Sequence, residues 1–320
     1  MDAAVEWLLS SRDPSVQYFT LVDVLGRSAR FEEVAQAWER IPHSPRIRAL
    51  VRGQRRDGGF GVHPYRKWSG AHWRLISLVE LGIPARHPVA LAAVEQVLTW
   101  LFSPEHTRRI YTVGGLVRQH ASQEGNALAV CCRLGLAEGP RVRSLADSLL
   151  RAQWPDGGWN CDPSPTARHS SFHESLHPLW GLSEFARATG DTSAARAADR
   201  ASELFLEHRL FRSHTSGAVA DDEWLKLHYP AYWHYDVLQA LLCLSRHGKV
   251  DDPRASEALD VLERKQRVDG TWAPEGRRYW RLSSASGSGV DVVDWGRTGP
   301  NDMLTLNGLR VLRAAGRIAL

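Results

Sequence analysis

The sequence predicts an all-α protein in which six helix pairs close a double ring, within a single domain that spans residues 1–320. Three observations predict this fold: a heptapeptide that occurs three times, a regular alternation of helix start and stop signals, and amphipathic runs between them. A lone helix pair cannot bury its apolar face. Because each pair needs a neighbour on both sides, a closed ring with the second helix of each pair inside satisfies all six.

The heptapeptide follows the pattern Gln-x-x-Asp-Gly-Gly/Thr-aromatic at Gln54–Phe60, Gln153–Trp159 and Gln266–Trp272. Asp-Gly permits the positive φ that a tight turn needs. We expect each glutamine to finish an outer helix with its amide bonded to nearby backbone. We expect each aromatic side chain to be largely buried against an adjacent pair, at the same end of the ring.

Proline, serine or threonine begins most of the predicted helices, and glycine ends many of them, as helix capping favours. The second helix of each pair is the more apolar, which places it inside the ring. The predicted helices span residues 2–11, 14–25, 31–40, 45–52, 69–81, 88–101, 122–134, 140–152, 171–189, 192–208, 231–247, 253–265 and 300–315.

Five long loops each run from an outer helix to an inner one, so they gather at one end of the ring, where functional loops are expected. The Ser/Gly-rich stretch Ser283–Gly289 predicts a flap over this mouth. The loops span residues 57–69, 103–121, 159–170, 210–229 and 271–299.

The composition is that of an ordinary globular protein, with 43% hydrophobic and 24% charged residues. The net charge is only +4 and the arginines are scattered, so a nucleic-acid-binding stripe is not expected. The chain shows no signal peptide and no apolar run that could span a bilayer. Its 4 cysteines form no disulfide framework. We therefore expect a cytoplasmic monomer or homodimer whose partner is a small-molecule substrate.

The triplicated turn resembles the repeat of squalene and hopene cyclases and of protein prenyltransferase β subunits. The resemblance covers most of the chain through the regular succession of helix pairs, and it is most specific at the three heptapeptides. It implies an (α/α)6 toroid with a central, aromatic-lined cavity, and an isoprenoid or similarly apolar substrate. A fold of this kind does not by itself define an activity.

The sequence departs from this family pattern in two respects. Triterpene cyclases protonate their substrate with an Asp-x-Asp-Asp motif, which is missing here. The nearest stretch, Ala220–Glu223, lacks the spacing and predicts a solvated acidic turn. Diphosphate binding would require a basic cluster, and the sequence does not indicate where one would form.

A zinc site is the main functional expectation. Prenyltransferase β subunits carry a zinc bound by Asp, Cys and His near the entrances of the inner helices. Here His120, His173 and His234 each lie roughly four helical turns before the glycine that ends their helix, so they are level around the ring. Cys161 lies in the loop beside them. Thiolate and imidazole groups are ligands that zinc prefers.

Each candidate ligand also has a purely structural interpretation. Cys161 could be a small buried hydrophobe, His234 a core or capping histidine, and His120 a loop histidine bonded to backbone. The stretch His173–His177 reads His-Glu-x-x-His, which on a helix places two imidazoles on one face. Because Pro178 follows and removes a helix bond, we take this stretch as support for a metal and not for a protease.

Glu174 and Asp236 are the candidate general bases. The leading hypothesis is a zinc-dependent enzyme of hydrolase, transferase or lyase type that acts on a small, partly apolar substrate. The alternatives are a non-catalytic toroid that binds a ligand or partner, and a metal-independent protein similar to terpene cyclases. The candidate substrate-binding residues are Trp73, Trp233, Tyr235 and Trp295, with Trp280 as a further aromatic.

Overall fold

The computed structural model describes residues 3–276 and 291–319, and the predicted flap Ser283–Gly289 and Trp280 lie outside the described residues. The described part is mainly helical, and its named strands form one short hairpin. The expectation of an all-α protein is therefore confirmed at the level of a mainly helical chain. None of the helices in the described ranges is both long and apolar enough to cross a membrane.

The elements follow one another with short connections over most of the chain. The α-helices are α1 (Ala3–Leu9), α2 (Pro14–Phe19), α3 (Glu32–Arg40), α4 (Pro45–Val51), α5 (Ala71–Glu80), α6 (Pro88–Leu101), α7 (Pro104–Thr107), α8 (Ala121–Arg133), α9 (Pro140–Ala152), α10 (Phe172–Thr189), α11 (Thr192–Glu207), α12 (Val237–His247), α13 (Ser256–Arg264) and α14 (Asp302–Ala314). The shorter elements are the π-helix η1 (Thr20–Val24), the 3-10 helices η2 (Ile41–His43), η3 (Asp222–Leu225) and η4 (Pro253–Ala255), and the strands β1 (Tyr111–Val113) and β2 (Leu116–Arg118).

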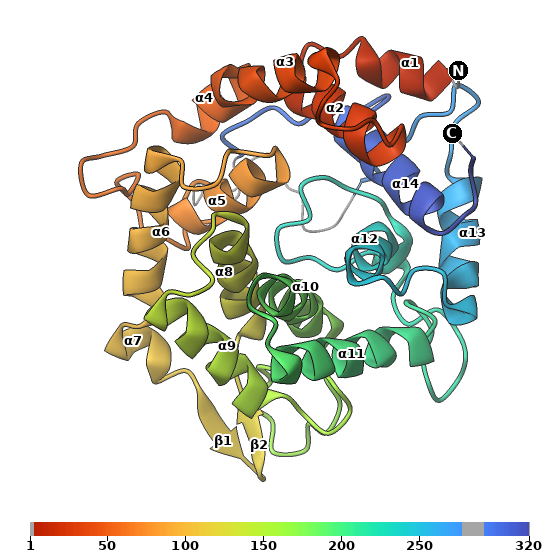
Figure 1. The fold of residues 1–320 in the computed structure, drawn as a ribbon. Helices are drawn as coiled ribbons and strands as arrows, with labels where there is room; N and C mark the ends of the chain where they lie inside the picture. The colour runs from red at the N-terminus through yellow and green to blue at the C-terminus, as the bar shows by residue number, and fades with distance from the viewer. Residues whose placement is uncertain (1–2, 277–290, 320) are drawn as a thin grey trace.

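The helices lie in two layers around a common centre (Figure 1). In the inner layer α8 contacts α5 and α10, and α12 contacts α10 and α14. The last helix, α14, also contacts α1, α2 and η1, so the two ends of the chain meet. The outer layer includes α6, α9, α11 and α13.

The two layers differ in burial as their sequences predict. The outer helices α9 and α11 each bury one stripe of residues, whereas α8 and much of α10 are buried on nearly every side. The crossing of α8 and α10 is tight because both contribute glycine. A Cβ atom on Gly181 would lie 2.4 Å from the carbonyl oxygen of Gly125.

The three heptapeptides form the same turn. In the second copy, the Trp154 N–H donates to the carbonyl of Gly158 at 2.8 Å, and the Gly157 N–H donates to the carbonyl of Trp154 at 3.0 Å. The other copies repeat this pair of bonds at the equivalent positions. Gly157 has a φ of +93°, which a residue with a side chain would adopt only with strain.

The glutamine amides clamp these turns as expected. Gln153 donates from Nε2 to the carbonyls of Gly157 and of Ala197 in the next outer helix, and Gln54 and Gln266 make the equivalent local bond. Only Gln153 directly follows its helix, however. The prediction that all three glutamines finish a helix is therefore wrong for the other two, because α4 and α13 end earlier, at Val51 and Arg264.

The aromatic residues of the turns divide into two groups. Trp159 and Trp272 are fully buried, and their indole N–H groups donate to the carbonyls of Leu149 and Leu262. Phe60 is only half-buried. Its ring has no N–H to anchor it in the same way, and the guanidinium of Arg74 stacks 4.0 Å from its centroid. The burial prediction is therefore correct for the two tryptophans and wrong for Phe60.

Two further predictions need correction. The helix expected over residues 231–247 begins only at Val237, because Tyr232 has a φ of +52° and Asp236 caps the helix by accepting from the Gln239 N–H. The stretch expected as a long loop at residues 103–121 contains α7 and the β1–β2 hairpin.

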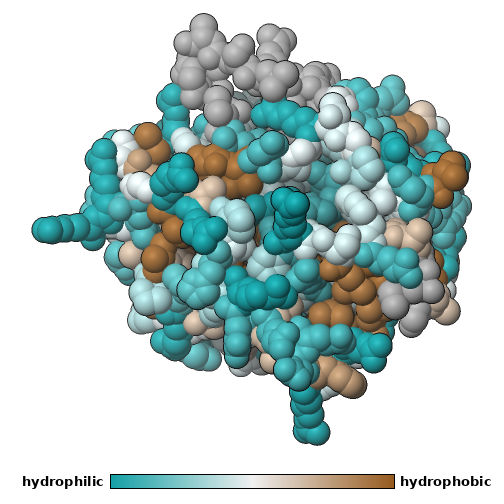
Figure 2. Space-filling view, turned by 90° about the horizontal axis from the view of Figure 1, so that it is seen from above, coloured by the Kyte–Doolittle hydropathy of each residue, from teal (hydrophilic) through white to brown (hydrophobic). Residues whose placement is uncertain are grey.

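Figure 2 shows the molecule from above. This face is mainly hydrophilic, and its hydrophobic groups are separated by polar side chains. Mixed surfaces of this kind are normal for globular proteins. The core of the molecule lies between the two helix layers, where the buried apolar side chains form one large cluster.

Candidate functional site

Three of the predicted site residues, His120, Cys161 and Glu174, lie together at the N-terminal ends of α8 and α10. His120 is the N-cap residue of α8, Glu174 lies in the first turn of α10, and Cys161 lies in the loop before it. The Glu174 Oε1 atom is 3.6 Å from Nδ1 of His120 and 3.4 Å from Sγ of Cys161. One donor atom from each residue lies within 4.8 Å of the others.

The second heptapeptide turn positions Cys161. The Trp159 N–H donates to the hydroxyl of Ser175, and the Ser171 N–H donates to the carbonyl of Trp159. These bonds fix the chain after Trp159 against the first turn of α10. The Gln119 N–H also donates to the carbonyl of Asn160, which joins the approach to α8 to the same loop. As a result, the thiol lies beside a carboxylate thirteen residues farther along the chain.

Hydrogen bonds keep Glu174 ionised although it is buried. Burial alone would raise the pKa of Glu174, but hydrogen bonds from His120 and from the Ser122 N–H lower it below its ordinary value. Ser122 lies in the first turn of α8, where a helix attracts negative charge. Hydrogen bonds to Cys161 and Glu174 raise the pKa of His120 to about 10. At neutral pH the metal-free cluster therefore contains an imidazolium beside a carboxylate.

The donor set fits a zinc ion. Zinc bonds to sulfur, nitrogen and oxygen at about 2.0–2.3 Å in tetrahedral geometry, which places neighbouring ligand atoms about 3.4–3.6 Å apart. The two distances from Glu174 Oε1, 3.4 and 3.6 Å, match this spacing. Within the described part of the chain, only these three residues form a group of this kind. A zinc ion held by these three residues would keep a fourth position open.

The other two predicted ligands, His173 and His234, lie outside this group. The Nδ1 atom of His173 accepts from the Tyr235 N–H at 2.9 Å, and the His173 ring lies 6.4 Å from the ring of His234. His234 is buried and stacks on Trp233 with ring centroids 4.1 Å apart. Sequence reasoning gave Glu174 the role of a base and not of a ligand, because its contact with Cys161 depends on how the folded loop returns to α10.

His173 instead lines a cleft of about 630 Å³ at the start of α10. His169, His208 and His214 line the same cleft, together with Trp224. The volume lies within the range of small-molecule sites. Because Glu174 directly follows His173, the cleft lies next to the His120–Cys161–Glu174 group along the chain.

Asp236, the second candidate base, belongs to a different pair. Its side chain is fully buried, with Oδ2 2.5 Å from Nδ1 of His228, while Oδ1 caps α12. Tyr235 is also fully buried, and its hydroxyl donates to the carbonyl of Leu210. The catalytic role of Asp236 and the substrate-binding role of Tyr235 remain predictions.

Five aromatic residues form a cluster on the loops before α5 and α12 and on α5 itself, in which Trp233 joins the others through Lys67, whose ammonium lies over both Trp68 and Trp233. Trp68 stacks on Tyr232 at 4.2 Å and meets Trp73 at 4.9 Å. Tyr65 also contacts Trp73, and its hydroxyl bonds to the side chain of Gln123 in α8. The members of this aromatic cluster are Tyr65, Trp68, Trp73, Tyr232 and Trp233.

Tyr65 connects the aromatic cluster to the candidate site, because the negative charge of Glu174 acts on its hydroxyl. Together with burial, which is the larger effect, this charge raises the pKa of Tyr65. Trp295 contacts Tyr229 and Arg46. Of the predicted substrate-binding residues, Trp73 and Trp233 belong to the aromatic cluster, and Trp295 adjoins it through a side-chain hydrogen bond with Tyr232.

The sequence analysis did not single out Asp291. The Tyr232 hydroxyl donates to its Oδ1 at 2.5 Å, and burial raises the pKa of this carboxyl. Arg297 lies 3.7 Å from the other oxygen. Asp291 joins the aromatic cluster only through the folded chain, so no local motif marked it.

No family model and no curated protein matches the chain. Among solved structures, a protein from Actinoplanes shares 19% identity at a TM-score of 0.44, covering 98% of both chains. The type II terpene cyclase MstE from Scytonema shares 17% identity at the same TM-score, covering 99% of this chain and 97% of its own. MstE has also been solved in complex with geranylgeranyl dihydroxybenzoate, its substrate, at 18% identity. Similarities this low carry no functional argument.

Proposed function

We propose that this chain is a zinc-dependent enzyme whose metal is bound by His120, Cys161 and Glu174, and that it acts on a small, partly apolar substrate. The observation that carries the proposal is the meeting of one sulfur, one nitrogen and one oxygen donor within 4.8 Å. Three protein ligands with an open fourth position are typical of catalytic zinc, whereas structural zinc has four.

A bound zinc ion would lower the pKa of a water or thiol, or polarise a substrate oxygen. The chain's own residues would hold the substrate. The aromatic cluster, which meets the proposed metal ligands through Tyr65, would supply the apolar contacts. We also infer that the helices form an (α/α)6 toroid, which the contacts of α14 with α1 and α2 support.

Zinc titration of the metal-free protein against a competing chromophoric chelator tests this proposal. The wild type should bind one equivalent, and His120→Ala should weaken binding by at least about tenfold, the typical cost of losing part of a metal site. The exposed His43, changed to alanine, is the matched control. Equal affinity in the wild type and His120→Ala would reject the site.

A metal-independent cyclase similar to terpene cyclases is the second candidate. The environment of Asp291 favours it, because burial raises the pKa of this carboxyl and the acid bonds to Tyr232, which stacks on Trp68. A protonated carboxyl can donate a proton, and aromatic faces stabilise the cation that results. Turnover of an isoprenoid polyene in EDTA that is lost in Asp291→Asn would favour this candidate. If neither zinc nor polyene is bound, the non-catalytic alternative remains.

A further inference from the structure

A cluster of arginines lies at the opposite end of the inner helices from the candidate zinc site. Arg133 ends α8, Arg246 lies in the last turn of α12, and Arg310 and Arg313 lie in the last turns of α14. With Asp23 they line a cavity of about 480 Å³. Glu174 of the candidate zinc site and Glu184 beside the arginine cluster both lie on α10. They are ten residues apart, which corresponds to roughly 15 Å along a helix.

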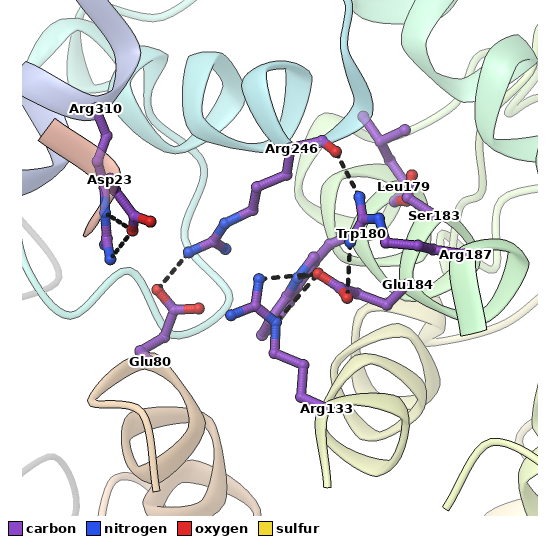
Figure 3. Close-up of polar contacts among 10 residues, drawn as sticks. All are labelled: Asp23, Glu80, Arg133, Leu179, Trp180, Ser183, Glu184, Arg187, Arg246 and Arg310. Atoms are coloured by element: carbon purple, nitrogen blue, oxygen red, sulfur yellow. Dashed lines mark hydrogen bonds and ion pairs between the residues drawn. The ribbon is translucent and has the colours of Figure 1, made fainter. Parts of the chain in front are cut away.

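The arginines outnumber the acids beside them. Figure 3 shows guanidinium groups from three inner helices directed into this region, with a carboxylate beside each. The closest pairs are Arg246 with Glu80 at 2.8 Å, Arg133 with Glu184 at 2.9 Å and Arg310 with Asp23 at 2.6 Å. Arg187 shares Glu184, and among the residues that the structure describes Arg313 binds only the backbone carbonyl of Asp23. Five arginines therefore meet three carboxylates, an excess of two positive charges.

Several guanidinium N–H groups are left over for a ligand. Arg246 uses Nη2 for Glu80, and within residues 3–276 and 291–319 its Nε and Nη1 make no hydrogen bond. By the same count, Nη1 of Arg133 and Nη2 of Arg313 are unused. The planar fork of arginine matches the oxygens of phosphate or carboxylate groups.

The position of the cluster strengthens its attraction for anions. The side chains of Arg246 and Arg310 are only 16% and 10% exposed, so nearby charges are poorly screened by water. Burial lowers the pKa of Arg310 and the positive charge of Arg246 adds to this effect, although Asp23 opposes both. A concave surface with excess charge of one sign concentrates ligands of the other sign.

Helix polarity explains part of this arrangement. The C-terminal carbonyls of the inner helices attract cations, each by about 0.3–1 kcal/mol. That attraction accounts for an arginine at the end of each helix. It does not account for a second arginine on α14, or for an open cavity bordered by unused donors.

We propose that this cavity binds a compact polyanion of the diphosphate class. The volume is sufficient for a diphosphate with part of an attached group. The binding site is independent of the proposed zinc site and of the reaction. It also supplies a basic cluster that the sequence could not locate, because its arginines come from α8, α12 and α14 and meet only in the folded chain.

Calorimetric titration of the metal-free protein with inorganic pyrophosphate tests the proposal. EDTA is present throughout, because pyrophosphate also binds zinc. The wild type should bind at one saturable site and unfold at a higher temperature with the ligand. The double variant Arg133→Gln/Arg313→Gln should lose at least about tenfold in affinity, as expected when charge-assisted bonds are removed. The control is Arg151→Gln, which changes an exposed arginine in the last turn of α9.

Two results would overturn the proposal. One is a wild-type unfolding temperature that sodium chloride at equal ionic strength raises as much as pyrophosphate does. The other is unchanged affinity in the double variant. If the double variant fails to fold, Arg313→Lys decides the question: it keeps the charge but loses the planar fork, so binding should weaken, and unchanged binding would contradict the assignment.

Discussion

The thiol of Cys161 donates to Oε1 of Glu174 at 3.4 Å, although one residue lies in a loop and the other on the inner helix α10. The heptapeptide turn makes this contact possible. Buried Trp159 anchors the loop, and its N–H and carbonyl both bond to the start of α10. The repeated structural motif of the fold therefore also positions the candidate site.

Trp159→Ala should cost on the order of 3–5 kcal/mol in the free energy of unfolding, as for other fully buried large aromatics. Phe60→Ala at the equivalent position should cost about 1–2 kcal/mol, because its ring is only half-buried. Urea denaturation of both variants measures the difference. Equal losses would show that the burial of the aromatic ring does not determine how much each turn contributes to stability.

Gly157→Ala should destabilise the protein by more than about 2 kcal/mol, because positive φ is strained for alanine and the new methyl has no space. Its Cβ atom would lie 2.3 Å from the carbonyl oxygen of Arg200. Gly217→Ala is the matched control, with a φ of +67° and nothing within 4 Å. Its expected loss is about 1–2 kcal/mol, from the backbone strain alone. Thermal unfolding of the pair tests whether the turn must dock closely on α11.

Local signals predicted most of the fold. Proline at helix starts and glycine at helix ends gave most boundaries to within a few residues, as at α9, where Pro140–Ala152 matches the predicted range. The start of α12 could not be read this way, because Tyr232 adopts a positive φ and stacks on Trp68, far away in sequence, and no local motif marks either feature.

The candidate site was predictable only in part. His120 and Cys161 were expected to meet because both lie at inner-helix entrances. The place of Glu174 beside Cys161 depends on how its side chain turns, and the His-Glu-x-x-His pattern does not encode that. The arginine cluster and the Tyr232–Asp291 bond join segments that only the folded chain brings together.

The metal-free protein should lose stability as the pH rises toward 10. The folded-state pKa of His120, about 10, lies above its unfolded value near 6.5, so its contribution is complete below pH 6.5 and disappears as the pH rises through 10. His120→Gln should flatten this part of the stability curve, measured by urea unfolding between pH 7 and 10. An unchanged slope would contradict the bonds to Cys161 and Glu174.

Buried His177 should make the protein sensitive to acid. Burial lowers the pKa of His177 to about 4, so between about pH 6.5 and 4 the unfolded chain binds more protons and stability falls with the pH. His177→Gln should reduce this slope, and His43→Gln, at an exposed position, should not. Unfolding temperatures across this range provide the measurement.

Cobalt(II) titration of the metal-free protein tests the central claim most directly, because cobalt replaces zinc and a thiolate ligand gives it a strong absorption band in the near ultraviolet. The account predicts one equivalent with this band. The band should be absent in Cys161→Ser, with affinity reduced at least about tenfold in Glu174→Gln. A wild-type protein that binds no cobalt, or a Cys161→Ser variant that keeps the band, would contradict it.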